Sequence, residues 1–328
     1  MLVSVAVLSL LVLVLTTITE QTGAAWRQTS GKIEQFRSAR DAFDSITRRL
    51  SQATLNTYWD YDNPTTPTRY IRQSELRFLS GPMDAIAGTP PGGKAWPTHG
   101  IFFQAPVGFS VTPAAGSPDP TGLENLLNTW GYFVEFGEDN ASSPPFPTHT
   151  VRYRYRLYEF MEPANDLKLY NLTSGNFAYN GKDWFLPSLK ANKRPVHALA
   201  DNVIALVLVP KLSAQEDQTA TQLAPDLLYD STTSKSAADI NPKNQLPPVV
   251  QVTMVAIDET SAARLAAGSS IPEIGLGTKF ASTPAAAAKV QDDLKSLQEY
   301  LTSRKINFRV FTDSVILRTA RWSTEQSD

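Results

Sequence analysis

The sequence predicts an α+β fold in which a long N-terminal helix packs on a predominantly antiparallel β head with long loops. Residues 1–18 are apolar, and an amphipathic pattern typical of a surface helix continues to about residue 56. The rest of the chain combines short apolar runs with 23 prolines and Ser/Thr-rich connections, which favours strands joined by loops. We therefore expect a stalk helix at 1–56 and a β-rich head at 57–328, with a subdivision near 213–245 left open.

The opening stretch predicts a membrane-spanning helix. It holds no charged side chain. At about 1.5 Å per residue its eighteen residues cover roughly 27 Å, slightly less than the ~30 Å hydrocarbon core of a bilayer. The apolar side chains expected in this helix are Leu2, Val3, Val5, Val7, Leu8, Leu10, Leu11, Val12, Leu13, Val14, Leu15 and Ile18.

Two other interpretations of the opening stretch stay open. A secretory signal peptide has a similar apolar run, and residues 22–25 are small enough for a peptidase to cut there, but no Lys or Arg precedes the run. A buried core helix is the other alternative, although such helices seldom lack a polar face. The nearest cations, Arg27, Lys32 and Arg37, follow the stretch and by themselves favour a cytoplasmic head.

The amphipathic continuation predicts a helix that lies on the head. Its apolar side chains recur with helical periodicity, and charged side chains occupy the opposite face. The residues expected to pack against the head are Ile33, Phe36, Phe43, Ile46 and Leu50. Residues 58–68 then predict a turn-rich exit from the helix.

Short segments of the head predict strands and helices. The clearest strand is 151–160, where arginines alternate with tyrosines and aliphatic residues, and the continuous apolar run 202–209 predicts a buried strand. Residues 213–245 are poor in apolar side chains and predict a long surface loop. Further strands are expected at 70–79, 101–105, 132–136 and 249–257, with a closing pair at 307–310 and 314–322. Helices are expected at 123–128, at 261–267 and after Pro284, with Thr283 as the N-cap.

Composition and motifs argue against several classes of function. The chain has 30 basic and 32 acidic residues, so no basic excess predicts nucleic acid as a partner. It has no cysteine, which excludes disulfides and thiolate metal sites. Its three histidines, His99, His149 and His197, are widely separated in proline-flanked loops, and no nucleophile motif stands out. We therefore expect no enzymatic activity, no catalytic residues, no bound metal and no cofactor.

Both ends of the chain resemble a known family. Residues 1–8 (MLVSVAVL) look like the apolar segment that follows the Thr-Leu-x-Glu of type IV pilins and of the pseudopilins of type II secretion. The tracts 246–249 (LPPV), 252–259 (VTMVAIDE) and 311–323 are similar to protein C of the Verru_Chthon cassette, whose nearest general relative is the J-type minor pseudopilin. The family's Gly/Phe cleavage site and Glu are missing here, so we expect a true start upstream of Met1.

This resemblance implies a pilin-like fold and a non-enzymatic minor pilin or pseudopilin. The subunit would be a single-pass inner-membrane protein, with its head in the periplasm or on a cell-surface filament. Its partners would be other pilin-like subunits, contacted through the N-terminal helix near the tip of a type IV pilus or a type II secretion pseudopilus. With an upstream start, a prepilin peptidase would process the leader and the new N-terminus would be methylated. The alternative is a secreted or periplasmic β-rich binding protein with a cleaved signal peptide.

Overall fold

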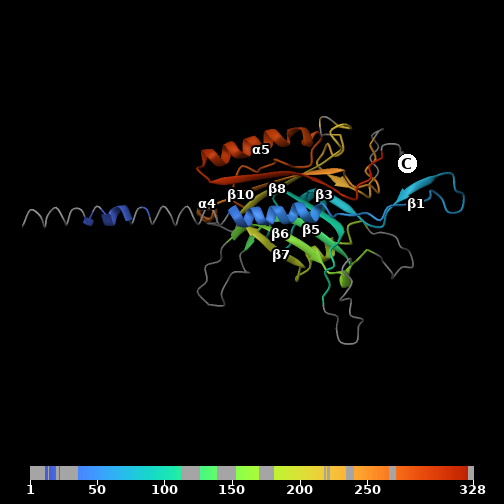
Figure 1. Cartoon of the computed structure of the whole chain (residues 1–328), viewed down its shortest axis with the longest axis horizontal. Coiled ribbons are helices and arrows are strands. Elements are labelled where there is room, and N and C mark those ends of the chain that lie inside the picture. Colours follow the sequence, from blue (N-terminus) through green and yellow to red (C-terminus); the bar gives the residue numbers. More distant parts are fainter. Residues whose placement is uncertain are drawn as a thin grey trace, which may run out of the picture.

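Antiparallel sheets make up most of the computed structural model, and the helices that it describes are short (Figure 1). The described strands form a two-stranded, a three-stranded and a six-stranded sheet, and neighbouring strands are antiparallel. The structure describes residues 12–13, 15–19, 22, 36–111, 126–138, 153–169, 181–217, 219, 222–233, 240–265 and 271–323.

The six-stranded sheet forms one layer, with strand order β7-β6-β5-β4-β3-β9. Its two faces carry separate apolar clusters: Phe103 and Tyr132 belong to the main core, whereas Phe102, Phe133 and Phe160 pack with the two short helices on the other face. These helices are α2 (Met83–Ala87) and α3 (Leu186–Lys190). The strands are β3 (Phe78–Pro82), β4 (His99–Pro106), β5 (Leu127–Glu138), β6 (Tyr153–Glu162), β7 (Val196–Asp201) and β9 (Tyr229–Asp230).

The three-stranded sheet forms the second layer, with strand order β11-β10-β8. β8 (Val203–Lys211) is buried along its length except at Lys211, and it contacts β3, β4, β5 and β6 of the larger sheet. β10 (Val249–Ile257) lies between β8 and β11 (Phe308–Ile316). The main core therefore lies between the two sheets, with β8 at its centre.

Two helices complete the layers. The helix at 36–50 packs against both sheets, because the Phe43 ring lies 5.8 Å from that of Phe311 and the Arg49 guanidinium lies 4.8 Å from the Trp130 ring. α5 (Ala286–Ser303) runs beside the three-stranded sheet and buries Leu297 and Leu301 (Figure 1). The remaining elements are β1 (Tyr58–Tyr61), β2 (Tyr70–Gln73), η1 (Ala164–Asp166) and α4 (Glu259–Leu265).

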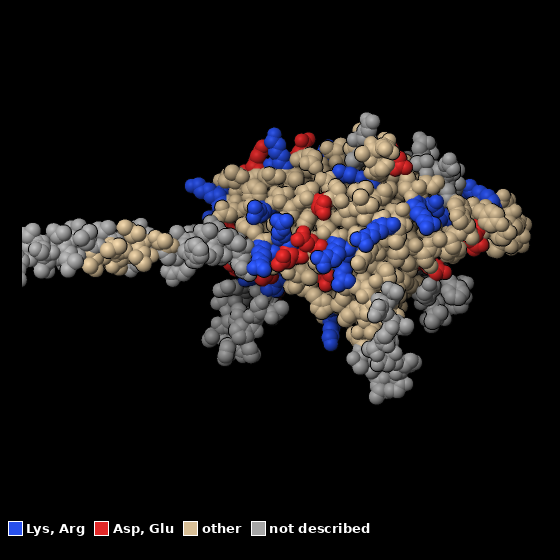
Figure 2. Space-filling model, viewed as in Figure 1, with Lys and Arg blue, Asp and Glu red and all other residues tan. Residues whose placement is uncertain are grey.

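The structure contradicts the predicted fold class, with its long N-terminal helix, and the predicted inner-membrane localisation. The described part of the predicted stalk includes the helix at 36–50, whose exposed side carries mixed basic and acidic side chains (Figure 2). The part of the chain that the structure describes contains no helix long and apolar enough to cross a membrane. Mainly antiparallel β structure with short helices replaces the predicted pilin-like architecture.

Several strand predictions are confirmed. They were the segments with the plainest patterns, either strict alternation or an uninterrupted apolar run. β10 has the predicted bounds, and β8 lacks only residue 202 of the expected range. β4, β5 and β6 contain the other confirmed segments, at 101–105, 132–136 and 153–160.

Other predictions are wrong because tertiary contacts override the local pattern. The expected closing pair is one strand, β11, which pairs with β10 over nine residues. The expected strand at 70–79 divides into β2 and the start of β3, which belong to different sheets. Residues 213–245 are more than a surface loop, because Leu223, Leu227 and Tyr229 enter the core.

Two helix predictions also need correction. Thr283 does not cap α5 with its side chain; the residue before the helix is Ala285, in a left-handed conformation with φ 59°. Within the helix expected at 123–128, residues 123–125 lie outside the described residues, and 127–128 begin β5. The helix expected at 261–267 is α4, which begins two residues earlier.

A single residue, Asn202, moves the chain from one sheet to the other. β7 ends in the six-stranded sheet just before it, and β8 begins in the three-stranded sheet just after it. Its φ of 61° is left-handed, a conformation that asparagine accepts more readily than most residues. Its N–H donates to the Tyr155 carbonyl at 2.8 Å and its carbonyl accepts from the Ile257 N–H at 3.0 Å, so the corner is bonded to both sheets.

We expect the variant Asn202→Ala to be less stable than Asn202→Gly by about 1 kcal/mol, because a β-carbon raises the energy of the left-handed conformation. Both variants lose the side-chain hydrogen bond to Glu259, so their difference isolates the backbone effect. Urea unfolding monitored by circular dichroism measures it. At the exposed Asn192, whose φ is not positive, the order should reverse, because glycine loses more conformational entropy on folding than alanine. Equal stabilities of the two Asn202 variants would contradict the expected strain of a β-carbon in the left-handed conformation at this position.

The side chains of Thr98 and His99 accept hydrogen bonds from backbone N–H groups at the outer edge of β8. That edge has no neighbouring strand in the three-stranded sheet, yet it is buried. The Leu208 N–H donates to Nδ1 of His99 at 3.0 Å, and Nε2 of His99 donates to the Phe280 carbonyl at 2.8 Å. The Leu206 N–H donates to the Thr98 hydroxyl at 3.1 Å. Burial lowers the pKa of His99 to about 4, against the opposing effect of the two backbone hydrogen bonds, so the imidazole is neutral near pH 7.

This burial predicts that the free energy of unfolding falls as the pH drops from 7 to 5. The unfolded histidine, with a pKa near 6.5, takes up a proton that the folded protein resists until about pH 4, so stability present above pH 6.5 is lost on the way down. The expected loss is roughly 1 kcal/mol between pH 6 and pH 5. Urea unfolding of the wild type and His99→Gln measures it. An equal slope in both proteins would show that other groups cause the pH dependence.

Candidate binding surface

An exposed aromatic hairpin projects from one end of the molecule (Figure 1). In the pairing of β1 with β2, Trp59 lies opposite Arg72 and Tyr61 lies opposite Tyr70. Opposite residues, and residues two apart on one strand, share a face of the sheet, so these four side chains belong to one face. Trp59 is 57% exposed and Tyr70 is 60% exposed. Exposed aromatic groups of this size mark interaction surfaces more often than isolated apolar residues do.

The aromatic face is held in place by local contacts. The rings of Tyr61 and Tyr70 stack with centroids 4.8 Å apart, and their hydroxyls are 3.1 Å apart. The Arg72 guanidinium lies 5.7 Å from the Trp59 ring, within cation–π range. At the turn, the carboxylate of Asp62 accepts from the side chain and the N–H of Thr68, which lowers the pKa of Asp62. The hairpin therefore presents its aromatic face on an ordered turn.

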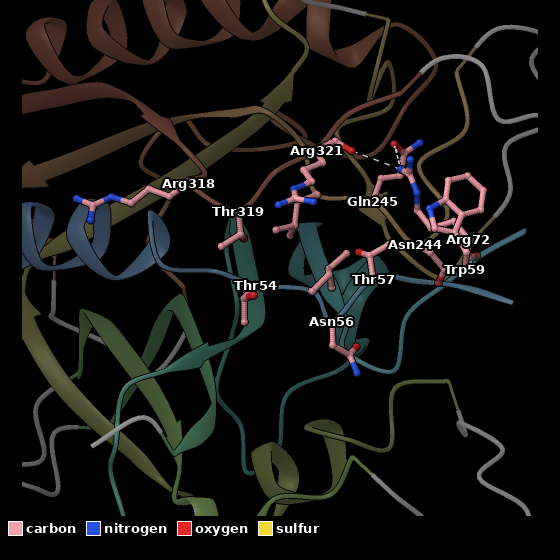
Figure 3. A pocket seen from close by; sticks show the side chains of 12 residues that line it. Thr54, Asn56, Thr57, Trp59, Arg72, Asn244, Gln245, Arg318, Thr319 and Arg321 are labelled. Carbon is pink, nitrogen blue, oxygen red and sulfur yellow. Dashed lines mark hydrogen bonds between the residues drawn. The ribbon is translucent and has the colours of Figure 1, made fainter. Parts of the chain in front are cut away.

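A cleft of about 660 Å³ opens beside this face (Figure 3). Four separate segments line it: the connection after the helix at 36–50, the hairpin, the loop before β10 and the segment after β11. The lining residues are Thr54, Leu55, Asn56, Thr57, Trp59, Arg72, Asn244, Gln245, Leu246, Arg318, Thr319 and Arg321. Because Trp59 and Arg72 also belong to the hairpin face, we treat the cleft together with Tyr61 and Tyr70 as one hairpin–cleft surface.

Gln245 joins the segments that line the cleft. Its side-chain oxygen accepts hydrogen bonds from Nη1 of Arg72 and from the N–H of Ser323 at 2.9 Å. Its side-chain nitrogen donates to the carbonyls of Asn241 at 2.7 Å and Ser323 at 3.2 Å. The neighbouring Asn244 donates to the Arg72 carbonyl at 2.7 Å. These buried amides fix the geometry of the cleft before any ligand binds.

The cleft is positively charged and carries no negative charge among its lining residues. Arg72 donates to Gln245 and, at 3.4 Å, to the Arg321 carbonyl, and burial lowers the pKa of its guanidinium without neutralising it. The guanidinium groups of Arg318 and Arg321 make no ion pair with the described residues. In Figure 3 the Arg318 side chain extends away from the other labelled residues. Arg72 and Arg321 therefore supply the charge available to a ligand.

Elsewhere, two buried carboxylates are engaged by basic side chains of the protein. Glu135 of β5 accepts two hydrogen bonds from Arg194, at 2.6 and 2.8 Å, and one from the Trp96 indole at 3.0 Å. The Lys94 ammonium lies 3.0 Å from the same carboxylate. Burial raises the pKa of Glu135, but Arg194 and Lys94 outweigh that effect and lower it, so the carboxylate is ionised. This cluster ties the loop before β4 to β5 and is structural.

A second cluster joins Glu162, Ser188 and Lys168. The Ser188 hydroxyl donates to the Glu162 carboxylate at 2.7 Å and accepts from the Lys168 ammonium at 2.6 Å. Burial raises the pKa of Glu162, although Ser188 and Lys168 oppose the shift. An ammonium that donates to a hydroxyl is not placed to remove the proton of that hydroxyl. The cluster therefore connects α3 to the end of β6 and does not form an activated nucleophile.

The predicted packing residues lie in the core or outside the described residues. Phe43, Ile46 and Leu50 are buried between the sheets and Phe36 packs against their cluster, while Ile33 lies outside the described residues. Of the predicted membrane helix, the described side chains are exposed, namely Val12, Leu13, Leu15 and Ile18. The other predicted residues of this helix lie outside the described residues, namely Leu2, Val3, Val5, Val7, Leu8, Leu10, Leu11 and Val14.

The described residues offer no metal-binding cluster. They contain no group of three or more His, Asp or Glu side chains that could hold a metal ion. The two described histidines have different surroundings. His99 is buried and hydrogen-bonded at the edge of β8, and His197 is exposed on β7. His149 lies outside the described residues.

The hairpin–cleft surface was not predicted from the sequence. Residues 58–68 were predicted as a turn-rich exit from the helix, whereas the structure places β1 at 58–61. The signal that could have indicated it was YWDY at 58–61, which places three aromatic residues in one short segment just before the strand expected at 70–79. Nothing in the sequence indicated that Arg72, Gln245 and Arg321 would meet.

No protein-family model matches the chain, and no curated protein and no solved structure matches it either. Function is therefore inferred from the hairpin–cleft surface and from the sequence.

Proposed function

We propose that this protein is a non-enzymatic binding protein whose recognition site is the hairpin–cleft surface. The observation that carries the proposal is the junction of an exposed aromatic face with a preformed polar cleft, linked through Trp59 and Arg72. Aromatic rings supply contact area at low conformational cost, and arginines with amides supply orientation and specificity. The fixed hydrogen bonds of Gln245 reduce the entropy that binding would otherwise cost.

The chemistry of the lining favours binding over catalysis. None of the twelve residues that line the cleft is an Asp, Glu, His, Lys, Ser or Cys. Proton transfer and nucleophilic attack in enzymes depend on such groups. Arginine stays protonated, and threonine hydroxyls need a neighbouring base to act as nucleophiles. The cleft can hold and orient a ligand, but it offers no acid–base pair.

The test measures binding of the full chain to four immobilised probes: a neutral β-glucan, polygalacturonate, a mixed decapeptide library and oligodeoxythymidine. At least one probe should bind with a Kd below about 1 mM. Trp59→Ala should weaken that binding about tenfold. Tyr58→Ala, which removes an aromatic ring from the opposite face of the hairpin, is the matched control and should bind like the wild type. Binding of none of the probes, or equal binding by both variants, would overturn the proposal.

We propose as a second function that the chain is a minor subunit of a type IV pilus or a type II secretion pseudopilus. The sequence resemblance at both ends supports it. So does one placement: the helix at 36–50 begins at the end of the described body opposite the β1–β2 hairpin (Figure 1). A subunit arranged in this way would contact its neighbours at one end and present a ligand-binding hairpin at the other.

Photo-cross-linking in the native host tests this assembly. A photoreactive amino acid replaces Arg48, which is exposed on the helix at 36–50, or Thr66, which is exposed in the hairpin turn. The Arg48 position should cross-link to proteins that mass spectrometry identifies as pilin-like subunits, and the Thr66 position should not. Cross-links to such subunits from Thr66 alone, or from neither position, would contradict the proposed assembly.

A further inference from the structure

We infer that the ligand of the hairpin–cleft surface is an acidic polysaccharide, a chain of sugar rings that carry carboxylates. This inference rests on the proposed binding function and adds the chemical class of the ligand. Three properties of the surface support it: unpaired positive charge, an exposed aromatic platform, and neutral hydrogen-bonding groups between them.

The positive charge of the cleft favours an anionic ligand. Three of its lining residues are arginines and none is acidic. Arg321 is exposed, and its guanidinium makes no hydrogen bond or ion pair with the described residues. Arg72 is fixed by Gln245 on one side and has further N–H groups for a ligand. Guanidinium groups bind carboxylates through paired hydrogen bonds, which are stronger than bonds between neutral groups.

The aromatic platform formed by Trp59, Tyr61 and Tyr70 favours a ligand with flat, weakly polar faces. Trp59 and Tyr61 are two residues apart on β1, so their side chains are spaced by roughly 7 Å along one face of the strand. Tyr70, which lies opposite Tyr61 on β2, stacks on the Tyr61 ring and widens the platform across the hairpin. The face of a sugar ring presents C–H groups that pack on aromatic rings, and a chain of sugars can follow a linear row of them. A small anion such as phosphate would leave this platform unused.

The neutral groups of the cleft suit a ligand rich in hydroxyls. The hydroxyls of Thr54 and Thr57 and the amide of Asn244 are among the groups that line the cleft. The hydroxyls of Thr54 and Thr57 make no hydrogen bond with other described residues. Hydroxyl and amide groups donate and accept, so they match both roles of sugar hydroxyls.

The surface fits nucleic acid less well. The chain has a formal net charge of −2, and the hairpin itself carries Asp60 and Asp62. Binding to nucleic acid usually depends on a broad positive field, and the described cleft offers only a local group of arginines. Arg72 and Arg321 in one cleft match a short run of carboxylates whose sugar rings also pack on the aromatic face.

The experiment compares oligogalacturonate with its fully methyl-esterified form, which keeps the sugar rings and removes the charge. Calorimetric titration of the full chain should show binding of oligogalacturonate at least about tenfold tighter than binding of the ester. Arg321→Gln should remove most of that difference by weakening only the charged ligand. Arg48→Gln, an exposed arginine on the helix at 36–50, is the matched control and should leave both affinities unchanged. Trp59→Ala should weaken both ligands.

The other outcomes separate this inference from the proposed function. Equal affinity for the two oligosaccharides, with no effect of Arg321→Gln, would overturn the acidic class but keep a binding site that depends on Trp59. Binding of the decapeptide library or of oligodeoxythymidine through Trp59, without oligogalacturonate, would also overturn the inference and keep the function. Failure of all the probes would overturn both.

Discussion

The buried outer edge of β8 is the constraint on which the rest of the structure depends. An unpaired strand edge normally faces solvent, because its backbone groups would otherwise lack partners. Here the edge is buried against the six-stranded sheet, and the side chains of Thr98 and His99 replace the missing strand. Pro210, which has no N–H to satisfy, lies near the end of the same strand. This arrangement allows two sheets to share one core without merging into a single sheet.

The chain makes two different connections at opposite ends of the described body. Asn202 makes the turn from one sheet to the other in a single residue, so β7 and β8 need no loop. At the opposite end, the chain leaves the helix at 36–50 and extends into the β1–β2 hairpin before it enters β3. The hairpin belongs to neither large sheet, and its aromatic residues therefore stay exposed instead of joining the core.

The distribution of charge separates structural from functional polar groups. Buried Glu135 is matched by Arg194 and Lys94, and buried Glu162 is engaged by Ser188 and Lys168. Leaving such groups unpaired in the interior would cost several kcal/mol. The cleft shows the opposite arrangement, because Arg321 has charge and exposure but no acidic partner among the described residues. An unpaired guanidinium beside an aromatic platform is what makes this surface a recognition site in our proposal.

The sequence by itself determined the strands with strong periodicity, such as β10 and β6, and the apolar stripe through Phe43, Ile46 and Leu50, because alternation and helical spacing are local properties. The prediction of a long N-terminal helix was wrong, because an apolar run indicates burial but does not specify the surroundings in which the side chains are buried. Only the tertiary structure decided the division of strands between two sheets, the buried role of His99 and the binding surface. Arg72, Gln245 and Arg321 lie about 80 to 250 residues apart and meet only because the chain folds back on itself, and no pattern within a short window encodes such a contact.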